Sequence, residues 1–317
     1  MIVSNPEIES FKKTYNLLVI LGPTASGKTR LAVSLANILG GEIISADSRQ
    51  VYRGLDIGTG KDIAAYSGEW GAVPVHLIDV MEPAEEFSVF SFQRRFAASF
   101  HAIAGRGGFP VMAGGTGLYL DSVLCRYRMA QTPENQTLRE ELRELDMDAL
   151  RRRLEKSNPR LHNTTDLLER ERVVRAIEIA EHPPGATDIL PELPAFYPFV
   201  LGIHPPREAL RRRITARLLE RFDAGMVEEV RRLHADGVSW ERLDSFGLEY
   251  RYIALYLQEK MEFSEMKKLL NTKIHQFAKR QETWFRKMEK NGVRLHWIES
   301  PDADAALALM LGRIDDA

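Results

Sequence analysis

The feature that most constrains this chain is an apolar run that leads into a glycine-framed loop. Leu17–Leu21 is followed by Gly22-Pro-Thr-Ala-Ser-Gly-Lys-Thr29, which fits the P-loop pattern Gly-x-x-x-x-Gly-Lys-Thr in full. In such a loop the glycines let backbone N–H groups turn inward, and the helix that follows offers its positive N-terminal end. Lys28 is expected to reach phosphate oxygens, and Thr29 to hold Mg²⁺. The loop therefore predicts a di- or triphosphate ligand at the end of a β-strand.

The flanking sequence alternates strand and helix signals, as a parallel α/β sheet requires. Residues 30–39 have helical spacing of their apolar side chains and stop at a glycine pair suited to a helix end. We expect an α/β fold, a P-loop NTPase-like parallel sheet flanked by helices. Further strand-like stretches lie at 42–46, 73–80, 109–120 (running into a glycine-rich turn), 196–203 and 293–298, and helical ones at 91–104, 207–221 and 269–288.

The character of the sequence changes after about Cys125. Residues 126–182 lose strand signals and become rich in Arg, Glu and Leu at helical spacing, and a loop with four prolines follows at 182–194. We expect an all-helical insertion at 126–195 between two passes of a catalytic core, 17–125 and 196–300. Residues 1–16 are expected to form an N-terminal extension, and 301–317 a C-terminal tail.

Composition excludes several classes of protein. Basic and acidic groups nearly cancel (43 against 45), so any binding to a polyanion must come from local basic patches. A single cysteine excludes an intramolecular disulfide and a Cys-rich zinc module. The chain shows no bilayer-length apolar run and no signal peptide, so we expect a cytoplasmic protein, and nothing demands more than a monomer.

Several residues are candidates for the chemistry around the loop. Asp47 follows the 42–46 strand, and ligands of open α/β sheets lie at the carboxyl ends of strands, so it is expected near the P-loop. Asp79 ends the 73–80 stretch, where it either holds Mg²⁺ through water or, the favoured reading, caps a turn. Residues 114–117 include three glycines, which favours close approach of backbone to a ligand. Residues 54–61 are read as a loop that approaches the site.

Two helical stretches carry an excess of basic residues. Residues 207–221 include six arginines against two glutamates, which suits either a solvated helix face or an oxyanion role. Residues 269–288 interleave lysines and arginines with aromatic residues. That pattern suits a phosphodiester surface with base stacking, and ordinary packing explains the aromatic residues equally well.

Taken in this order, the motifs resemble the tRNA dimethylallyltransferases over residues 17–298. The resemblance rests on the P-loop and on Ile44-Ser-Ala-Asp-Ser-Arg-Gln-Val-Tyr52, Gly54-Leu-Asp-Ile-Gly-Thr59, His76-Leu-Ile-Asp79, Gly114-Gly-Thr-Gly-Leu-Tyr119, Arg172-Val-Val-Arg-Ala-Ile-Glu178, Arg213-Ile-Thr-Ala-Arg217 and Ala278-Lys-Arg-Gln-Glu-Thr-Trp-Phe-Arg286. The chain departs from the family pattern at 246–252, where many members have Gly-Tyr-Arg-Gln, and 160–166 is a loose version of the family's segment.

The resemblance implies transfer of a dimethylallyl group from its diphosphate to N6 of the adenosine immediately 3′ of the anticodon, releasing pyrophosphate. The P-loop would then bind the diphosphate leaving group, and ATP would not be the substrate. Asp47 would be the general base, an assignment that its position beside the P-loop also favours. The implied partners are dimethylallyl diphosphate and the tRNA anticodon stem-loop, with Mg²⁺ as cofactor.

The implied site residues fall into four groups. Asp47, Thr24 and Arg217 are catalytic candidates, and Ser48 and Gln50 would read the adenine edge. The diphosphate would contact Gly22, Thr24, Ala25, Ser26, Gly27, Lys28, Thr29, Arg213 and Arg217. The tRNA would contact Arg49, Val51, Tyr52, Gly117, Arg172, Arg175, Lys279, Arg280 and Arg286.

Three other functions fit parts of the sequence. An ATP-dependent small-molecule kinase explains the P-loop, a base at Asp47 and an arginine clamp, but leaves the insertion and the basic aromatic helix unexplained. An RNA-binding nucleotide switch is disfavoured because no clear Walker-B acid is present. A relative that prenylates free AMP is disfavoured by the basic helices between 207 and 290.

Overall fold

The structure is a computed structural model that describes residues 6–61, 63–68, 71–127, 132–157, 170–182 and 192–314. The chain divides into two compact units. The first comprises residues 1–127 and 192–317, and the second residues 128–191. Throughout the described ranges, no helix has both the length and the apolar character that crossing a bilayer demands.

A six-stranded sheet forms the centre of the first unit, with the order β5-β2-β6-β1-β7-β8 and every pairing parallel. The P-loop strand β1 is one of its middle strands and is buried at every position. This explains its uninterrupted apolar run, because a strand covered on both faces does not alternate. The strands are β1 Leu17–Leu21, β2 Gly41–Ala46, β5 Val75–His76, β6 Phe109–Gly114, β7 Pro198–Ile203 and β8 Leu295–Ile298.

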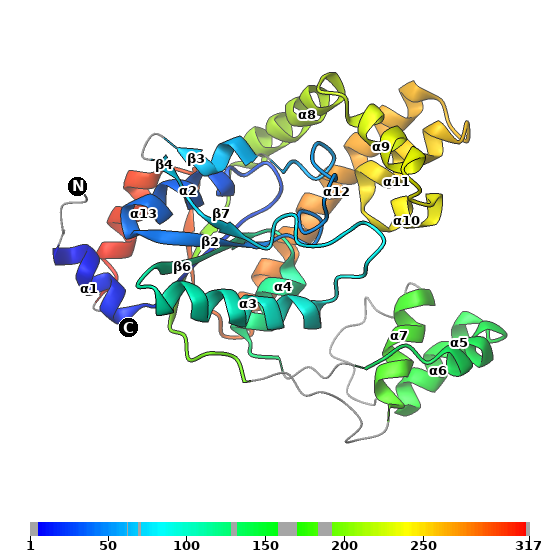
Figure 1. The fold of residues 1–317 in the computed structure, drawn as a ribbon, viewed down its shortest axis with the longest axis horizontal. Coiled ribbons are helices and arrows are strands. Elements are labelled where there is room, and N and C mark those ends of the chain that lie inside the picture. The colour runs from blue at the N-terminus through cyan, green and yellow to red at the C-terminus, as the bar shows by residue number, and fades with distance from the viewer. Residues whose placement is uncertain are drawn as a thin grey trace. The chain divides into compact units, whose positions relative to one another are not determined.

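Helices cover both faces of this sheet (Figure 1). One apolar core joins the sheet to α1 (Pro6–Thr14), α2 (Lys28–Leu39) and α13 (Ala303–Leu311). A second core on the other face joins it to α3 (Val89–Gly105), α4 (Gly117–Leu124) and the C-terminal part of α12 (Phe263–Lys290). The P-loop-like α/β fold is therefore confirmed.

A third apolar core lies within a cluster of helices that continues the first unit. It is formed by α8 (Arg207–Asp223), α9 (Met226–Ala235), α10 (Trp240–Ser245), α11 (Leu248–Leu257) and the N-terminal part of α12. Residues 51–55 pack into the same core. The segment that follows Asp47 is thereby fixed against the helices that carry the arginines. Between this segment and β5 lie the short elements η1 (Ile63–Tyr66), β3 (Ser67–Gly68) and β4 (Gly71–Ala72).

The second unit is helical in its described part. It contains α5 (Gln136–Arg143), α6 (Met147–Ser157) and α7 (Arg170–Ala180). Leucines on α5 and α6 pack with Val173 and Ile177 in a small core of their own. The unit spans 128–191, where we expected 126–195, and residues 160–166 lie outside the described part of the chain.

Two expectations about the fold are wrong. The strand expected at 73–80 is only Val75–His76, because Leu77 and Asp79 have positive φ (65° and 53°), which ends the extended backbone.

The segments expected to be an N-terminal extension and a C-terminal tail instead contribute helices to the core. On the α2 face of the sheet, α1 buries Phe11, and α13 buries Ala306 and Met310. α1 is apolar on one face, whereas α13 consists of apolar residues apart from Asp304. Burial of these apolar side chains holds both helices on the core.

Candidate active site

The P-loop lies between β1 and α2 at the carboxyl edge of the sheet. Gly27 adopts a left-handed conformation (φ 90°, ψ 13°) as the N-cap of α2, so Lys28 and Thr29 form the first turn of that helix. The Lys28 Nζ donates to the Pro23 carbonyl at 3.2 Å, which folds the side chain back over the loop. A β-carbon at Gly27 would lie 2.7 Å from Pro301 Cγ, so glycine is required here for packing as well as for φ.

Positive charge gathers around Lys28. Burial, together with the neighbouring Arg217 and Arg221, lowers the pKa of its ammonium group to about 8, and Asp47 opposes this shift. An ammonium group with a depressed pKa beside two guanidinium groups favours a ligand that brings compensating negative charge. The site is therefore electrostatically suited to an oxyanion.

Asp47 directly follows β2 and begins the turn that leaves the sheet. Its Oδ1 accepts hydrogen bonds from the backbone N–H groups of Arg49 (2.9 Å) and Gln50 (3.4 Å). The short side chain thus caps its own turn through one oxygen. The carboxylate is half-buried, and its interaction with Lys28 places it beside the P-loop, as expected from the topology.

The residues after Asp47 are held by neighbouring loops. The Ser48 N–H donates to Thr116 Oγ1 at 3.0 Å, which joins this turn to the glycine-rich turn after β6. The Gln50 Nε2 donates to the Gly60 carbonyl at 3.5 Å, and its Oε1 accepts from Ser45 Oγ at 3.4 Å. Both predicted adenine-reading side chains therefore lie in one short segment with Asp47.

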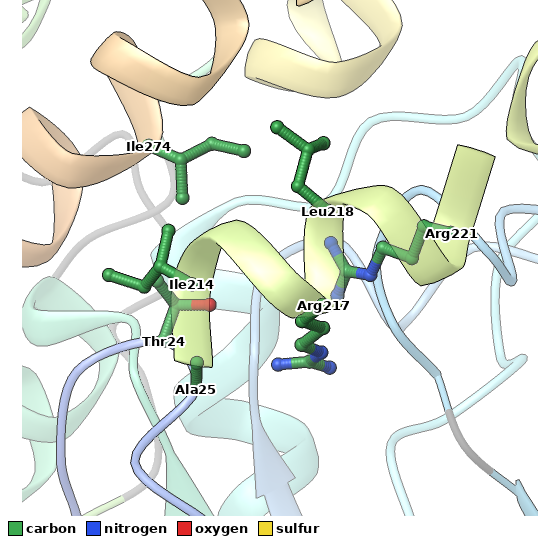
Figure 2. Close-up of a pocket in the computed structure, with 7 residues that line it drawn as sticks. All are labelled: Thr24, Ala25, Ile214, Arg217, Leu218, Arg221 and Ile274. Atoms are coloured by element: carbon green, nitrogen blue, oxygen red, sulfur yellow. The ribbon is translucent and has the colours of Figure 1, made fainter. Parts of the chain in front are cut away.

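A small pocket opens between the P-loop and the arginine helix α8. Thr24 and Ala25 line it from the P-loop, and Arg217 and Arg221 line it from α8, with apolar contributions from Ile214, Leu218 and Ile274. Figure 2 shows the two guanidinium groups extending from successive turns of α8, beside the P-loop residues. Phosphate-binding loop and cations thus meet at one place.

The loop at 54–61 contacts the two arginines. Arg217 Nη2 donates to the Gly60 carbonyl at 3.1 Å, and Arg221 Nη1 donates to the Gly58 carbonyl at 3.3 Å. Arg221 also pairs with Glu249 at 3.1 Å. The expectation that this loop approaches the site is confirmed.

Asp79 has a different partner from the metal considered for it. The buried Lys61 Nζ donates to Asp79 Oδ1, to Asp56 Oδ1 (2.8 Å) and to the Tyr52 carbonyl (2.8 Å). This ion pair uses the Asp79 carboxylate to satisfy a buried ammonium group. The arrangement does not support a role for Asp79 at the metal.

Two residues at this site were missed by the sequence reasoning. Arg221 lies one helical turn beyond Arg217 and lines the pocket, whereas Arg213, one turn earlier, is exposed and does not line it. The continued four-residue spacing from Arg217 was the available signal.

The second missed residue is Gln281 on α12. It accepts from the Thr24 N–H at 2.9 Å and donates to the Gly115 carbonyl at 2.8 Å. It ties the P-loop to the glycine-rich turn. Gln281 stands in the motif at 278–286, but the motif did not indicate this contact.

Other predicted diphosphate ligands are placed differently within the loop. The Ser26 hydroxyl is fully buried against Gly22, where a β-carbon would lie 2.7 Å from its Oγ. Thr24 lines the pocket, and Thr29 is half-buried in the first turn of α2. The P-loop residues that line the pocket are therefore Thr24 and Ala25, and the Ser26 side chain does not reach it.

Comparison with known proteins agrees with this geometry. The IPP transferase family model matches residues 50–288, well over half of the chain, and the isopentenyl transferase model matches residues 15–67. The chain belongs to the IPP transferase family. It is 56% identical over 305 residues to tRNA dimethylallyltransferase 2 of Citrifermentans bemidjiense, covering 96% of this chain and 97% of that protein. It is 53% identical over 301 residues to tRNA dimethylallyltransferase 1 of Syntrophus aciditrophicus, covering 94% and 98%.

Solved structures of this family share the fold. The tRNA isopentenylpyrophosphate transferase of Bacillus halodurans superposes with a TM-score of 0.68 at 31% identity, over 95% of this chain and 98% of that one. A eukaryotic dimethylallyltransferase acting on tRNA superposes with a TM-score of 0.74 at 21% identity, over 95% and 79%, which shows the fold alone.

The residues of this IPP transferase that were predicted to contact tRNA differ in their surroundings. Lys279, Arg280 and Arg286 are exposed on α12, and Arg172 is exposed on α7. Gly117 packs under Trp284, where a β-carbon would lie 2.5 Å from the indole. Arg49 is half-buried beside Asp47, and burial lowers the pKa of its guanidinium group. Arg175 donates to Glu178 (3.0 Å) and to the Thr132 carbonyl (2.6 Å), within the second unit.

Val51 and Tyr52 require correction. Val51 is fully buried and Tyr52 is 3% exposed, and both pack in the helical core. The Tyr52 ring packs against Phe246 at 4.9 Å between centroids, and its hydroxyl accepts from the Phe87 N–H. Neither side chain has surface to offer to tRNA, because each holds the Asp47 segment on the core.

Proposed function

We propose that the protein transfers a dimethylallyl group from dimethylallyl diphosphate to N6 of the adenosine immediately 3′ of the anticodon of tRNA, releasing pyrophosphate. The observation that carries this proposal is the meeting of P-loop, paired arginines and Asp47 at one edge of the sheet. Membership of the IPP transferase family and relatives named tRNA dimethylallyltransferase support it.

Asp47 has the position and chemistry of the general base. An exocyclic adenine amine is a weak nucleophile and must lose a proton as it attacks the allylic carbon. One oxygen of Asp47 caps its own turn, which fixes the carboxylate while the other oxygen accepts that proton. As the new N–C bond forms, the C–O bond to the diphosphate breaks and its electron pair leaves with the pyrophosphate.

The cations stabilise the charge that builds on the leaving group. Thr24, Lys28 and Arg217 would meet the oxygens of the departing diphosphate, and Arg221 would add a second guanidinium. Preorganised donors aimed at developing charge supply a large share of catalysis in such reactions. The P-loop thereby serves as a leaving-group site and not as a nucleotide site.

Adenine would be held beside Asp47. Ser48 and Gln50 would contact its edge, since an amide can pair with both the donor and the acceptor atoms of adenine. The base must leave its stack to reach this edge of the sheet, at a cost of a few kcal/mol. Exposed Lys279, Arg280 and Arg286 on α12 would bind the tRNA backbone, as would Arg172 on α7 of the insertion.

Mg²⁺ fits the residues present without a dedicated cage. Mg²⁺ in phosphate sites is held by one or two protein oxygens together with substrate phosphates and water. The described residues contain no cluster of three or more His, Cys, Asp or Glu side chains suited to a metal, so a single hydroxyl ligand is the fitting arrangement. Thr29 would hold the ion, which would neutralise charge on the diphosphate.

The kinase alternative and this proposal differ in one assay. The protein is incubated with unmodified tRNA, Mg²⁺ and either dimethylallyl diphosphate or ATP, and the tRNA is digested for mass spectrometry. We expect an N6-dimethylallyl adenosine with the isoprenoid donor alone. No modified nucleoside, with ATP consumed instead, would overturn the proposal.

A further inference from the structure

Glu229 on α9 is a buried carboxylate with an unusual set of partners. It is 2% exposed, lies in the helical core, and belongs to none of the motifs discussed above. Its Oε2 accepts from the backbone N–H groups of Asp56 (3.0 Å) and Ile57 (2.7 Å). Its Oε1 accepts from the Gly58 N–H (3.0 Å) and from the Tyr250 hydroxyl (2.7 Å). Four donors therefore satisfy one buried charge.

The same loop presents its carbonyl groups to α8. Gly58 donates its N–H to Glu229 and accepts from Arg221 through its carbonyl, so a single residue joins the two contacts. Two positions further on, the Gly60 carbonyl accepts from Arg217. The loop thus separates a buried anion on one side from two guanidinium groups on the other.

Both glycines are required for this close approach. A β-carbon at Gly58 would lie 2.6 Å from the Tyr250 ring, and one at Gly60 would lie 2.1 Å from Arg217 Nη2 and closer still to Arg221. Because glycine has no side chain, the Tyr250 ring packs directly on the backbone of Gly58, and the two arginines pack directly on the backbone of Gly60. The loop position is therefore set jointly by Tyr250, Glu229 and α8.

The hydrogen bonds of the buried Glu229 carboxylate indicate that it orients the loop at 54–61 as well as filling space in the core. A buried carboxylate is costly unless hydrogen bonds satisfy it, and hydrogen bonds to a charged acceptor are the stronger kind. Three consecutive N–H groups on one carboxylate fix the orientation of those peptide planes. The Asp56 and Ile57 carbonyls lie in the planes fixed in this way, and they accept from the N–H groups of Lys61 (2.9 Å) and Gly60 (3.0 Å). The Lys61 N–H shares a peptide plane with the Gly60 carbonyl, so the same contacts hold the carbonyl that Arg217 binds. The Gly58 carbonyl, which Arg221 contacts, belongs to the peptide plane directly after the fixed ones.

We propose that Glu229 and Tyr250 are positioning residues, which hold the loop at 54–61 so that its carbonyls aim Arg217 and Arg221 at the diphosphate. This inference rests on the proposed assignment of the diphosphate to the pocket between the P-loop and α8. Neither residue touches the ligand. They act through the backbone of Gly58 and Gly60.

Glu229→Gln is the first test. A glutamine keeps the volume but replaces one acceptor oxygen by an N–H₂ donor, which then faces a backbone N–H or the Tyr250 hydroxyl. We expect the Kd for pyrophosphate, measured by calorimetry, to rise about 10- to 100-fold, as for the loss of hydrogen bonds to a charged group. Tyr250→Phe removes one of the four donors and should weaken binding by about two- to tenfold. The Kd for tRNA should stay within about twofold in both variants.

A matched Glu→Gln control separates positioning from general destabilisation. Glu42, at the opposite end of β2, binds Arg106 and His76 and has no part in the site. Glu42→Gln should lower the Tm while leaving the pyrophosphate Kd unchanged. If Glu229→Gln does not fold, Tyr250→Phe decides the matter, and an unchanged pyrophosphate Kd in that variant overturns the proposal.

A double-mutant cycle tests the route through α8. If Glu229 acts through Arg217 and Arg221, then Glu229→Gln added to the double variant Arg217→Ala, Arg221→Ala should weaken pyrophosphate binding by about twofold or less. An undiminished effect in that background would overturn the proposal. These outcomes concern affinity, so they are distinct from failure of the proposed function, which would show as no prenyl transfer by the unaltered protein.

Discussion

At the scale of single residues, the site is a balance of charges around Lys28 and Asp47. Asp47 favours the charged form of Lys28, whereas burial and the two arginines on α8 oppose it. A bound diphosphate would bring negative charge to these cations and so favour the charged form of Lys28. Asp47 would remain beside them as the carboxylate that accepts a proton from the amine.

Replacing the general base should remove turnover and spare binding. Asp47→Ala should lower kcat by roughly 10²- to 10⁴-fold, the usual contribution of a positioned base. The Kd for tRNA, measured by filter binding, should change little, since the exposed cations on α12 remain. Near-normal rates for this variant would show that the base is assigned wrongly.

Lys28 should make diphosphate binding depend on pH. Its pKa is lowered to about 8, so in the free protein its ammonium form dominates below that pH and is lost as the pH rises through it. Pyrophosphate affinity should therefore fall between about pH 7 and about pH 9, with a proton taken up on binding at the higher pH. Lys28→Arg, which stays charged, should bind more weakly but with a flat profile over this range. A flat profile for the unaltered protein would contradict the role given to Lys28.

At the scale of elements, the site depends on how the loop at 54–61 meets α8. The sequence predicted the loop, the arginine-rich helix and the P-loop, because each has a local pattern of glycine, charge or apolar spacing. It did not show what Glu229, Arg221 and Gln281 contact, although Arg221 continues the four-residue spacing on α8 and Gln281 stands in the motif at 278–286. Their partners lie 171, 163 and 257 residues away in the chain, and no local pattern encodes such a distance.

The contact between the loop and α8 is tested by the same substitution at two glycines that have nearly equal φ. Gly60 (φ 63°) lies against the guanidinium groups, whereas Gly40 (φ 62°) has nothing within 4 Å of the position of a β-carbon. Gly60→Ala and Gly40→Ala should thus cost a similar backbone strain of about 1–2 kcal/mol. Only Gly60→Ala should also displace Arg217 and Arg221 and raise the KM for dimethylallyl diphosphate.

Equal effects of the two substitutions on KM would contradict the role of the loop. Thermal unfolding of both variants provides the control, because their Tm values should fall by similar amounts. Activity at saturating donor distinguishes lost binding from lost chemistry.

At the scale of the whole molecule, the ends of the chain complete the core rather than trail from it. Most strands of the sheet, and α2, α3, α8 and α12, were predicted from period and composition, but the order of the strands in the sheet was not. The terminal helices were not predicted either, because each has 9 residues, too few to show a clear helical period. Tyr15 and Arg313 come from opposite ends of the chain, and the Tyr15 hydroxyl donates to the Arg313 carbonyl at 3.3 Å. Burial of Phe11, Ala306 and Met310 in one core shows the same closure.

Shortening a buried side chain of α13 should therefore destabilise the first unit. Met310→Ala leaves a cavity in that core and should lower the free energy of unfolding by about 2–5 kcal/mol. Leu219→Ala on α8, where the side chain is 45% exposed, should cost far less. Chemical denaturation measures both, and an unchanged midpoint for Met310→Ala would mean that α13 is dispensable to the core.

The central claim is that the P-loop holds the diphosphate that leaves during prenyl transfer. It is tested most directly by measuring pyrophosphate release and N6-modified adenosine in the same reaction with dimethylallyl diphosphate, tRNA and Mg²⁺. The account predicts equal amounts of both products, both lost in Asp47→Ala and in Arg217→Ala. Pyrophosphate released at the same rate without tRNA, or modified adenosine formed only with ATP, would contradict it.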